Sequence, residues 1–202
     1  MVALAKSPVS SAICALAYAT EIAPLLAVAQ ARLGQFAQAH ATIDKTPRDC
    51  VPCETARGDI DALEKNGSGA ALWFAHAIRD APSLPFADRD WGEMLLRKGD
   101  LDGAIGKFES AHRKGPHFAD PLEMWGEALI AKNRSDIALA KFEEAAKYAP
   151  NWGRLHLKWG EALLWSGDET GAQSQFAAAA HLDLTAAEKS QLAHMETIHG
   201  GR

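Results

Sequence analysis

Apolar residues recur at helical spacing along most of the chain, and short runs of glycine, proline, asparagine and aspartate interrupt them. Apolar positions at i, i+3, i+4 and i+7 are typical of a helix with one buried face. Alanine is abundant while valine and isoleucine are sparse, a balance that favours helix over strand. The pattern therefore predicts an all-α protein with helices over residues 11–20, 24–33, 35–45, 54–65, 70–80, 86–98, 101–114, 121–132, 135–148, 154–166, 169–181 and 185–198.

Several of these predicted helices begin or end at characteristic residues. Pro24 suits the first turn of its helix, and Gly34 is expected to end that helix in the left-handed conformation. Asp100 is expected to cap the helix that follows it. Thr185 and Glu188 have the spacing of a capping box. Two prolines within six residues predict that 46–53 is a loop.

One apolar pattern returns at a fixed interval. Gly92, Gly126 and Gly160 stand 34 residues apart, and each follows a tryptophan and precedes a glutamate. A period without slippage indicates one supersecondary unit stacked on itself. The other positions that share this register are Gly58; Ala70, Ala104, Ala138 and Ala172; Phe74, Phe108, Phe142 and Phe176; Ala77, Ala111, Ala145 and Ala179; and Pro82, Pro116 and Pro150, with Leu184 in the last place.

A helix–turn–helix unit of 34 residues with these small, large and proline positions resembles the tetratricopeptide repeat (TPR) family. The resemblance implies an α–α superhelix, a solenoid of antiparallel helix pairs. Its expected divisions are an N-terminal helix or remnant of a preceding unit at 1–19, a degenerate unit at 20–50, four clear units at 51–84, 85–118, 119–152 and 153–186, and a capping helix with a frayed tail at 187–202.

The repeated small and aromatic residues predict how the helices pack. The small residues let the two helices of a unit approach closely, and each repeated phenylalanine fills the gap to the next unit. Trp91, Trp125 and Trp159 are interpreted as core residues, because an aromatic stripe at this spacing is core far more often than a cofactor site. The degenerate unit has a shorter link, because Ala27 and Gly58 are only 31 residues apart.

The resemblance also implies a concave groove for a peptide or protein segment, lined by one face of each first helix. The groove residues it implies are Asp59, Phe86, Arg89, Glu93, Arg97, Glu123, Glu127, Ile130, Arg154, Leu157, Glu161 and Trp165. Asp59, Glu93, Glu127 and Glu161 form a row of acids, which favours a basic, partly hydrophobic partner. The alternative is that these acids are ordinary solvated carboxylates, partly offset by the arginines.

Composition and motifs limit the function classes further. The net charge of −5 argues against a nucleic-acid partner. The sequence contains no phosphate-binding glycine loop, no Gly-x-Ser-x-Gly and no His-Glu-x-x-His, so neither an enzyme nor a cofactor is expected. Ala17 to Ala19 has the small-x-small form of a signal-peptidase site, but Lys6 is the only charge before it and Pro8 interrupts the segment. We expect a cytoplasmic protein without a membrane span, with a secretory signal as the alternative.

Cys50 and Cys53 form a Cys-x-Pro-Cys pair just before a predicted helix. A helix N-terminus stabilises a thiolate, which makes such a pair a candidate redox site. The alternatives are incidental loop cysteines or half of a metal site. The function predicted from the sequence is a non-catalytic scaffold or adaptor for a peptide or protein segment. A thiol-redox or metal-linked module, or the interaction region of a larger enzyme, is the alternative, and the oligomeric state is left open.

Overall fold

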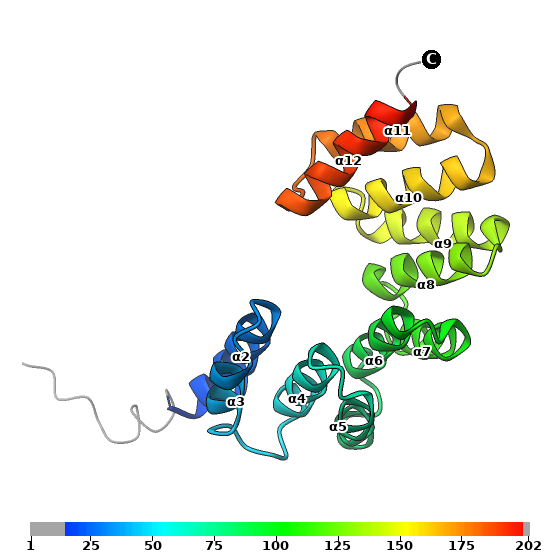
Figure 1. Ribbon diagram of the computed structural model, residues 1–202. Coiled ribbons are helices and arrows are strands. Elements are labelled where there is room, and N and C mark those ends of the chain that lie inside the picture. Colours follow the sequence, from blue (N-terminus) through cyan, green and yellow to red (C-terminus); the bar gives the residue numbers. More distant parts are fainter. Residues whose placement is uncertain (1–14, 200–202) are drawn as a thin grey trace, which may run out of the picture. The chain divides into compact units, whose positions relative to one another are not determined.

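The computed structural model describes residues 15–199, and every regular element in that range is helical (Figure 1). The predicted all-α fold of paired helices is confirmed. The elements are a π-helical turn η1 (Tyr18–Ile22) and the α-helices α2 (Ala23–Arg32), α3 (Phe36–Ile43), α4 (Val51–Leu63), α5 (Gly67–Asp80), α6 (Phe86–Lys98), α7 (Leu101–Lys114), α8 (Ala119–Ala131), α9 (Ser135–Tyr148), α10 (Gly153–Ser166), α11 (Glu169–Ala180) and α12 (Ala186–His199).

The chain divides into two compact units, Met1–Met94 and Leu95–Arg202. In the first unit α2 packs on α3 and α4, and α4 packs on α5. Its core is made of alanines with a few larger residues such as Ile43 and Ile60. In the second unit α8 packs on α9 and α10 on α11, and α12 covers this last pair through Leu192 and Met195. Each unit thus has its own apolar core.

The N-terminal helical segment does not break where the sequence predicts. Residues 15–17 are helical and lead through η1 directly into α2, so the predicted end at Thr20 is wrong. The reason is Pro24, whose missing N–H and bulky ring disrupt the regular i to i−4 pattern. In η1 the Ala23 N–H donates to the Tyr18 carbonyl, five residues back, and this wider turn accommodates the proline. Ser10, Ser11 and Cys14 lie outside the described residues.

Helix α4 begins three residues earlier than predicted. Cys50 is its N-cap, so Val51 and Pro52 belong to the first turn and only 44–50 connects α3 to α4. Proline is well tolerated there, because the first N–H groups of a helix have no partner within the helix. The predicted loop therefore extends too far at its C-terminal end.

A buried arginine secures this short connection. The guanidinium of Arg57, on α4, donates hydrogen bonds of 2.9–3.2 Å to the carbonyls of Ile43, Thr46, Pro47 and Cys53. The same group lies 5.3 Å from the ring centre of Trp73 on α5. Only 7% of the residue is exposed, and burial lowers the pKa of Arg57. One side chain thus satisfies carbonyls that a longer loop would direct to water.

The repeated glycines and phenylalanines meet inside a unit. A Cβ placed on Gly126 would lie 2.7 Å from Cζ of Phe142, and Gly58 and Gly160 face Phe74 and Phe176 in the same way. In these three repeats the glycine of the first helix therefore seats the phenylalanine of the second helix. Phe74 also stacks on Trp91 at 6.2 Å, so the ring reaches the following repeat as well. The prediction that the ring fills the gap to the next unit is therefore incomplete, because the ring also packs within its own unit.

Capping follows the predicted chemistry closely. Asp100 and Asp168 cap α7 and α11 by accepting a bond from the N–H three residues on, at 3.0 and 2.8 Å. Thr185 and Glu188 form the predicted capping box at the start of α12. Gly34 has φ +75 as expected. Lys65 adopts φ +64 without a glycine, which the sequence does not indicate.

Candidate functional site

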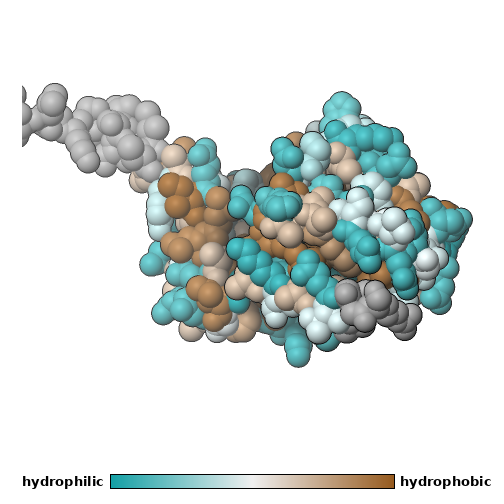
Figure 2. Space-filling model, turned by 90° about the horizontal axis from the view of Figure 1, so that it is seen from above, coloured by the Kyte–Doolittle hydropathy of each residue, from teal (hydrophilic) through white to brown (hydrophobic). Residues whose placement is uncertain are grey.

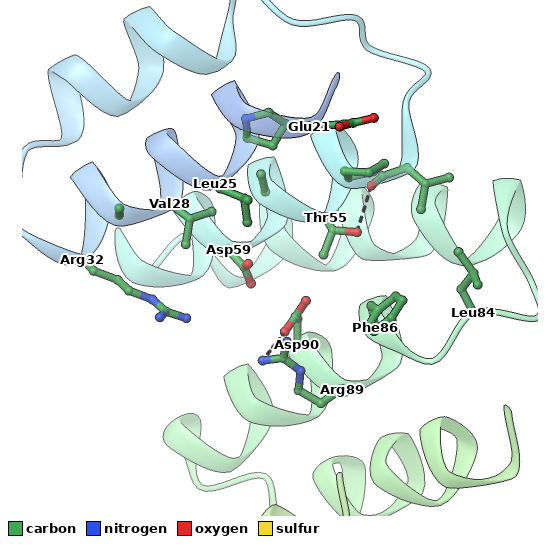
Figure 3. Close-up of a pocket in the computed structure, with 15 residues that line it drawn as sticks. Glu21, Leu25, Val28, Arg32, Thr55, Asp59, Leu84, Phe86, Arg89 and Asp90 are labelled. Atoms are coloured by element: carbon green, nitrogen blue, oxygen red, sulfur yellow. Dashed lines mark hydrogen bonds and ion pairs between the residues drawn. The ribbon is translucent and has the colours of Figure 1, made fainter. Parts of the chain in front are cut away.

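The first unit contains an apolar pocket of about 560 Å³, built from α2, α4 and the start of α6 (Figure 3). This volume falls within the roughly 300–1,000 Å³ typical of ligand sites. Most of the wall is apolar; its residues are Pro24, Leu25, Val28, Ala29, Val51, Pro52, Ala56, Leu84 and Phe86, and the polar lining residues are Glu21, Arg32, Thr55, Asp59, Arg89 and Asp90. The first helices of successive repeats thus provide the walls.

The apolar side chains at the rim are open to solvent. Leu25 is 74% exposed, Phe86 49% and Leu84 42%. In Figure 2 hydrophobic surface is open on the left of the view, over the N-terminal helices. Single exposed leucines are ordinary, whereas a cluster of exposed apolar side chains around a pocket is a feature that many interaction sites share. These residues can therefore lose water when a partner binds.

Asp59 provides the unpaired charge of the pocket. Its carboxylate forms no hydrogen bond or ion pair with any residue in the described range 15–199. Burial raises the pKa of Asp59 well above its usual range, and the neighbouring Asp90 raises it further, while Arg89 opposes both. Figure 3 shows Asp59 on α4 and Asp90 on α6 directed into the same space. Arg89 forms an ion pair with Asp90 at 2.8 Å, while the charge of Arg32 also lowers the pKa of Asp59.

A disulfide lies at one end of this pocket. It joins Cys50 and Cys53, with their Cα atoms 5.2 Å apart. The two residues between them, Val51 and Pro52, line the pocket. Because the two sulfurs bind each other, they are not available together for a metal. The described part of the chain contains no group of three or more His, Cys, Asp or Glu arranged to hold one.

The predicted acids of the second unit are paired with cations. Arg154 donates to Glu123 at 3.0 Å and to Glu127 at 2.6 Å, and Lys158 lies 3.1 Å from Glu161. Glu123 is completely buried, and burial raises its pKa, with Glu127 adding to the effect and Arg154 opposing it. These acids are therefore not a row of freely solvated carboxylates.

The remaining predicted groove residues differ in accessibility. Trp165 is 80% exposed, whereas Leu157 is completely buried in the core around Phe176. Ile130 is partly buried against the core that contains Phe142. Leu157 is therefore a core residue, because the N-terminal turns of α10 turn that side toward α11 and α12. In α6, Glu93 lies 3.7 Å from Arg89, and Arg97 is exposed.

Of the groove residues named above, Asp59, Phe86 and Arg89 line the pocket. Pro52 and Thr55, which occupy the same repeat positions as Phe86 and Arg89, line it as well. The contribution of α2 to the pocket was not predicted. The groove residues Phe86, Arg89, Glu93 and Arg97 lie six and three residues before Gly92 and one and five residues after it. The same offsets from Ala27, in the degenerate unit, give Glu21, Pro24, Val28 and Arg32, all of which line the pocket. The repeat register therefore contained the missing signal.

Solved structures with the same fold are TPR proteins. TTC0263 of Thermus thermophilus aligns over 90% of this chain and 98% of its own, with a TM-score of 0.73 at 17% identity. YrrB, described as a TPR protein with an unusual peptide-binding site, covers 96% of this chain and 100% of its own, with a TM-score of 0.60 at 14% identity. Yeast Tom70 covers 90% of this chain over 40% of its own, with a TM-score of 0.77 at 19% identity.

The chain therefore has the tetratricopeptide-repeat fold, and the predicted resemblance is confirmed at that level. No protein-family model and no curated protein matches the sequence. Within residues 15–199, no helix is long and apolar enough to cross a lipid bilayer.

Proposed function

We propose that the protein is a non-catalytic scaffold that binds a peptide or protein segment through the pocket of its first unit. The supporting observation is the combination of an open apolar wall with the unpaired Asp59 carboxylate. Burying apolar side chains of a partner at this wall would contribute about 25 cal/mol per Å² of surface removed from water. A fold of this kind places such a segment across the first helices of adjacent repeats.

The pocket charges indicate what the bound segment carries. Arg89 is engaged by Asp90, whereas Asp59 and Glu21 form no ion pair with any residue of the range 15–199 and face a site that also holds Arg32. A lysine or arginine beside a leucine or phenylalanine would satisfy Asp59 and fill the apolar wall together. We therefore propose a basic, partly hydrophobic segment. Trp165 of the second unit, being highly exposed, is proposed as a separate contact.

A labelled-peptide binding assay tests this function. Peptides in which leucine or phenylalanine neighbours lysine or arginine should bind, and matched peptides with glutamate in place of the basic residue should not. Asp59→Asn should weaken binding about tenfold, because a charge-assisted contact of roughly 1.5 kcal/mol is lost. Fluorescence anisotropy at several salt concentrations gives the affinities, and the affinity should fall as salt rises.

Asp136→Asn is the matched control, since Asp136 is an exposed acid on α9. It makes the same chemical change away from the pocket and should leave the affinity unchanged. Equal binding of the basic and acidic peptides, or equal loss in both variants, would contradict the proposed role of Asp59.

A further inference from the structure

We propose that the Cys50–Cys53 disulfide is a redox switch that controls the pocket: a dithiol reductant opens it, and the opened form binds the pocket's ligand more weakly. The inference rests on the proposed function only for its last step. Its basis is that the disulfide ring contains two residues of the pocket wall, Val51 and Pro52.

The disulfide fixes the beginning of α4. Cys50 is in the extended conformation, φ −103 and ψ 124, and its Sγ accepts a bond from the Cys53 N–H at 3.2 Å. The S–S bond ties this N-cap residue to the third residue of the helix, so it also holds the two residues between them. When the bond opens, Val51 and Pro52 are held only by the weaker contacts of a helix end, which frays readily. The pocket loses a rigid wall at that end.

The two sulfurs differ in access. Cys50 is half-buried, whereas Cys53 is completely buried. The proposal therefore places the first attack of a thiolate from solvent on the Cys50 sulfur. The Cys53 sulfur lies 3.7 Å from the Ala19 carbonyl oxygen, an acceptor that only the reduced thiol can use. The packing around α4 thus already contains a hydrogen-bond partner for the reduced form.

The exchange balances without any other reactant. One thiolate of the dithiol attacks Cys50 Sγ, and the S–S bond breaks with its electron pair leaving on Cys53, which takes a proton from solvent. The second thiolate of the reductant then attacks the reductant's first sulfur, which is bonded to Cys50 in the mixed disulfide. This step releases Cys50 as a thiolate at the positive end of α4 and leaves the reductant as a disulfide. Two electrons pass from the dithiol to the protein.

The effect of reduction remains local because Arg57 holds the connection independently. Its bonds to Ile43, Thr46 and Pro47 do not involve the sulfurs. The loop that precedes Cys50 therefore stays attached to α4 when the disulfide opens. The change is confined to the first turn of α4, whose residues Val51 and Pro52 form one part of the pocket wall.

Hydrogen exchange and peptide affinity, measured on the full chain with and without dithiothreitol, test the switch. Alkylation and mass spectrometry should show that dithiothreitol reduces Cys50 and Cys53 while the protein remains folded. The disulfide should form again when the reductant is removed. Amide exchange over 51–56 should rise about tenfold in the reduced form, and peptide affinity should fall about fivefold or more. A disulfide that resists excess dithiothreitol, or unchanged exchange over 51–56, overturns the proposal.

Variants remove the remaining ambiguity. Cys14→Ser should respond to the reductant as the wild type does, which excludes the third cysteine as the cause. The double variant Cys50→Ser, Cys53→Ser should show the reduced-form exchange without reductant and no response to it; a response would overturn the assignment to this pair. If no peptide binds in either state, the proposed function fails, while exchange over 51–56 still decides the switch. If peptides bind equally in both states, the pocket function stands and the switch falls.

Discussion

At the scale of the residue, the Asp59 carboxylate forms no ion pair within residues 15–199 and lies in a pocket beside Asp90. Burial and Asp90 raise the pKa of Asp59, so the Asp59 carboxyl stays protonated to a higher pH in the folded protein than in the unfolded chain. Between the unfolded value near 3.8 and the raised folded value, the folded state binds more protons. The free energy of unfolding therefore falls as pH rises through that window. The stability that the neutral Asp59 carboxyl preserves is fully present only below the window.

Asp59→Asn should consequently stabilise the protein at neutral pH, on the order of 1 kcal/mol, although it weakens peptide binding. The amide removes the charge that burial and Asp90 disfavour. The gain should shrink as the pH is lowered toward the ordinary value of 3.8, where the wild-type carboxyl is also neutral. Urea unfolding at several pH values measures this. A variant that is less stable than wild type at neutral pH would show that Asp59 is a structural acid.

At the scale of the element, three of the four clear repeats have a glycine seated against a phenylalanine, at Gly58, Gly126 and Gly160. The sequence predicts these positions because the 34-residue register is uninterrupted, and the bounds predicted for α6, α7 and α9 agree with the structure. It does not predict the turn at Lys65 or the continuous path from η1 into α2, because these depend on how Pro24 and a non-glycine turn are accommodated locally. The 34-residue period thus predicts the regular packing of the repeats, but it does not predict local departures from the repeat.

Gly126→Leu should destabilise the second unit by about 1–3 kcal/mol through overpacking, because the new side chain would occupy the space of the Phe142 ring. Gly106→Leu is the matched control, since nothing lies within 4 Å of a Cβ at that position of α7. That change should be neutral or slightly stabilising, because glycine is a poor helix former. Thermal melting of both variants checks the pair, and equal melting temperatures would contradict the packing described for Gly126.

At the scale of the whole molecule, the buried apolar residues form separate local cores, and the stability of a repeat protein is approximately a sum over such units. The sequence predicts the fold class and the repeat period, but it locates only part of the binding site. Asp59, Phe86 and Arg89 were predicted from the repeat register, whereas the wall from α2 belongs to a unit whose register is obscured by a shortened link. The ion pairs of Arg154 also escape a sequence argument, because charge alone does not show which acids share a cation.

Phe142→Ala should reveal this modular stability. The ring is 1% exposed, and its removal should cost about 3–5 kcal/mol within the second unit. Hydrogen exchange should accelerate in α8 and α9, while α2 and α4 keep their protection, because repeat proteins open in local segments. Uniform acceleration across all helices would instead indicate that the chain unfolds as one cooperative block.

The hydrogen bonds from Arg57 to the carbonyls between α3 and α4 have a consequence for protein engineering. Repeat arrays are usually built with linkers of constant length, yet here a link shortened by about three residues is tolerated because one guanidinium satisfies the carbonyls of the connection. Linker length in such arrays is then limited less by the reach of the backbone than by the supply of donors. Placing an arginine two turns into the following helix, with an aromatic ring beneath it, offers designers a way to shorten or re-angle the junction between helical repeats.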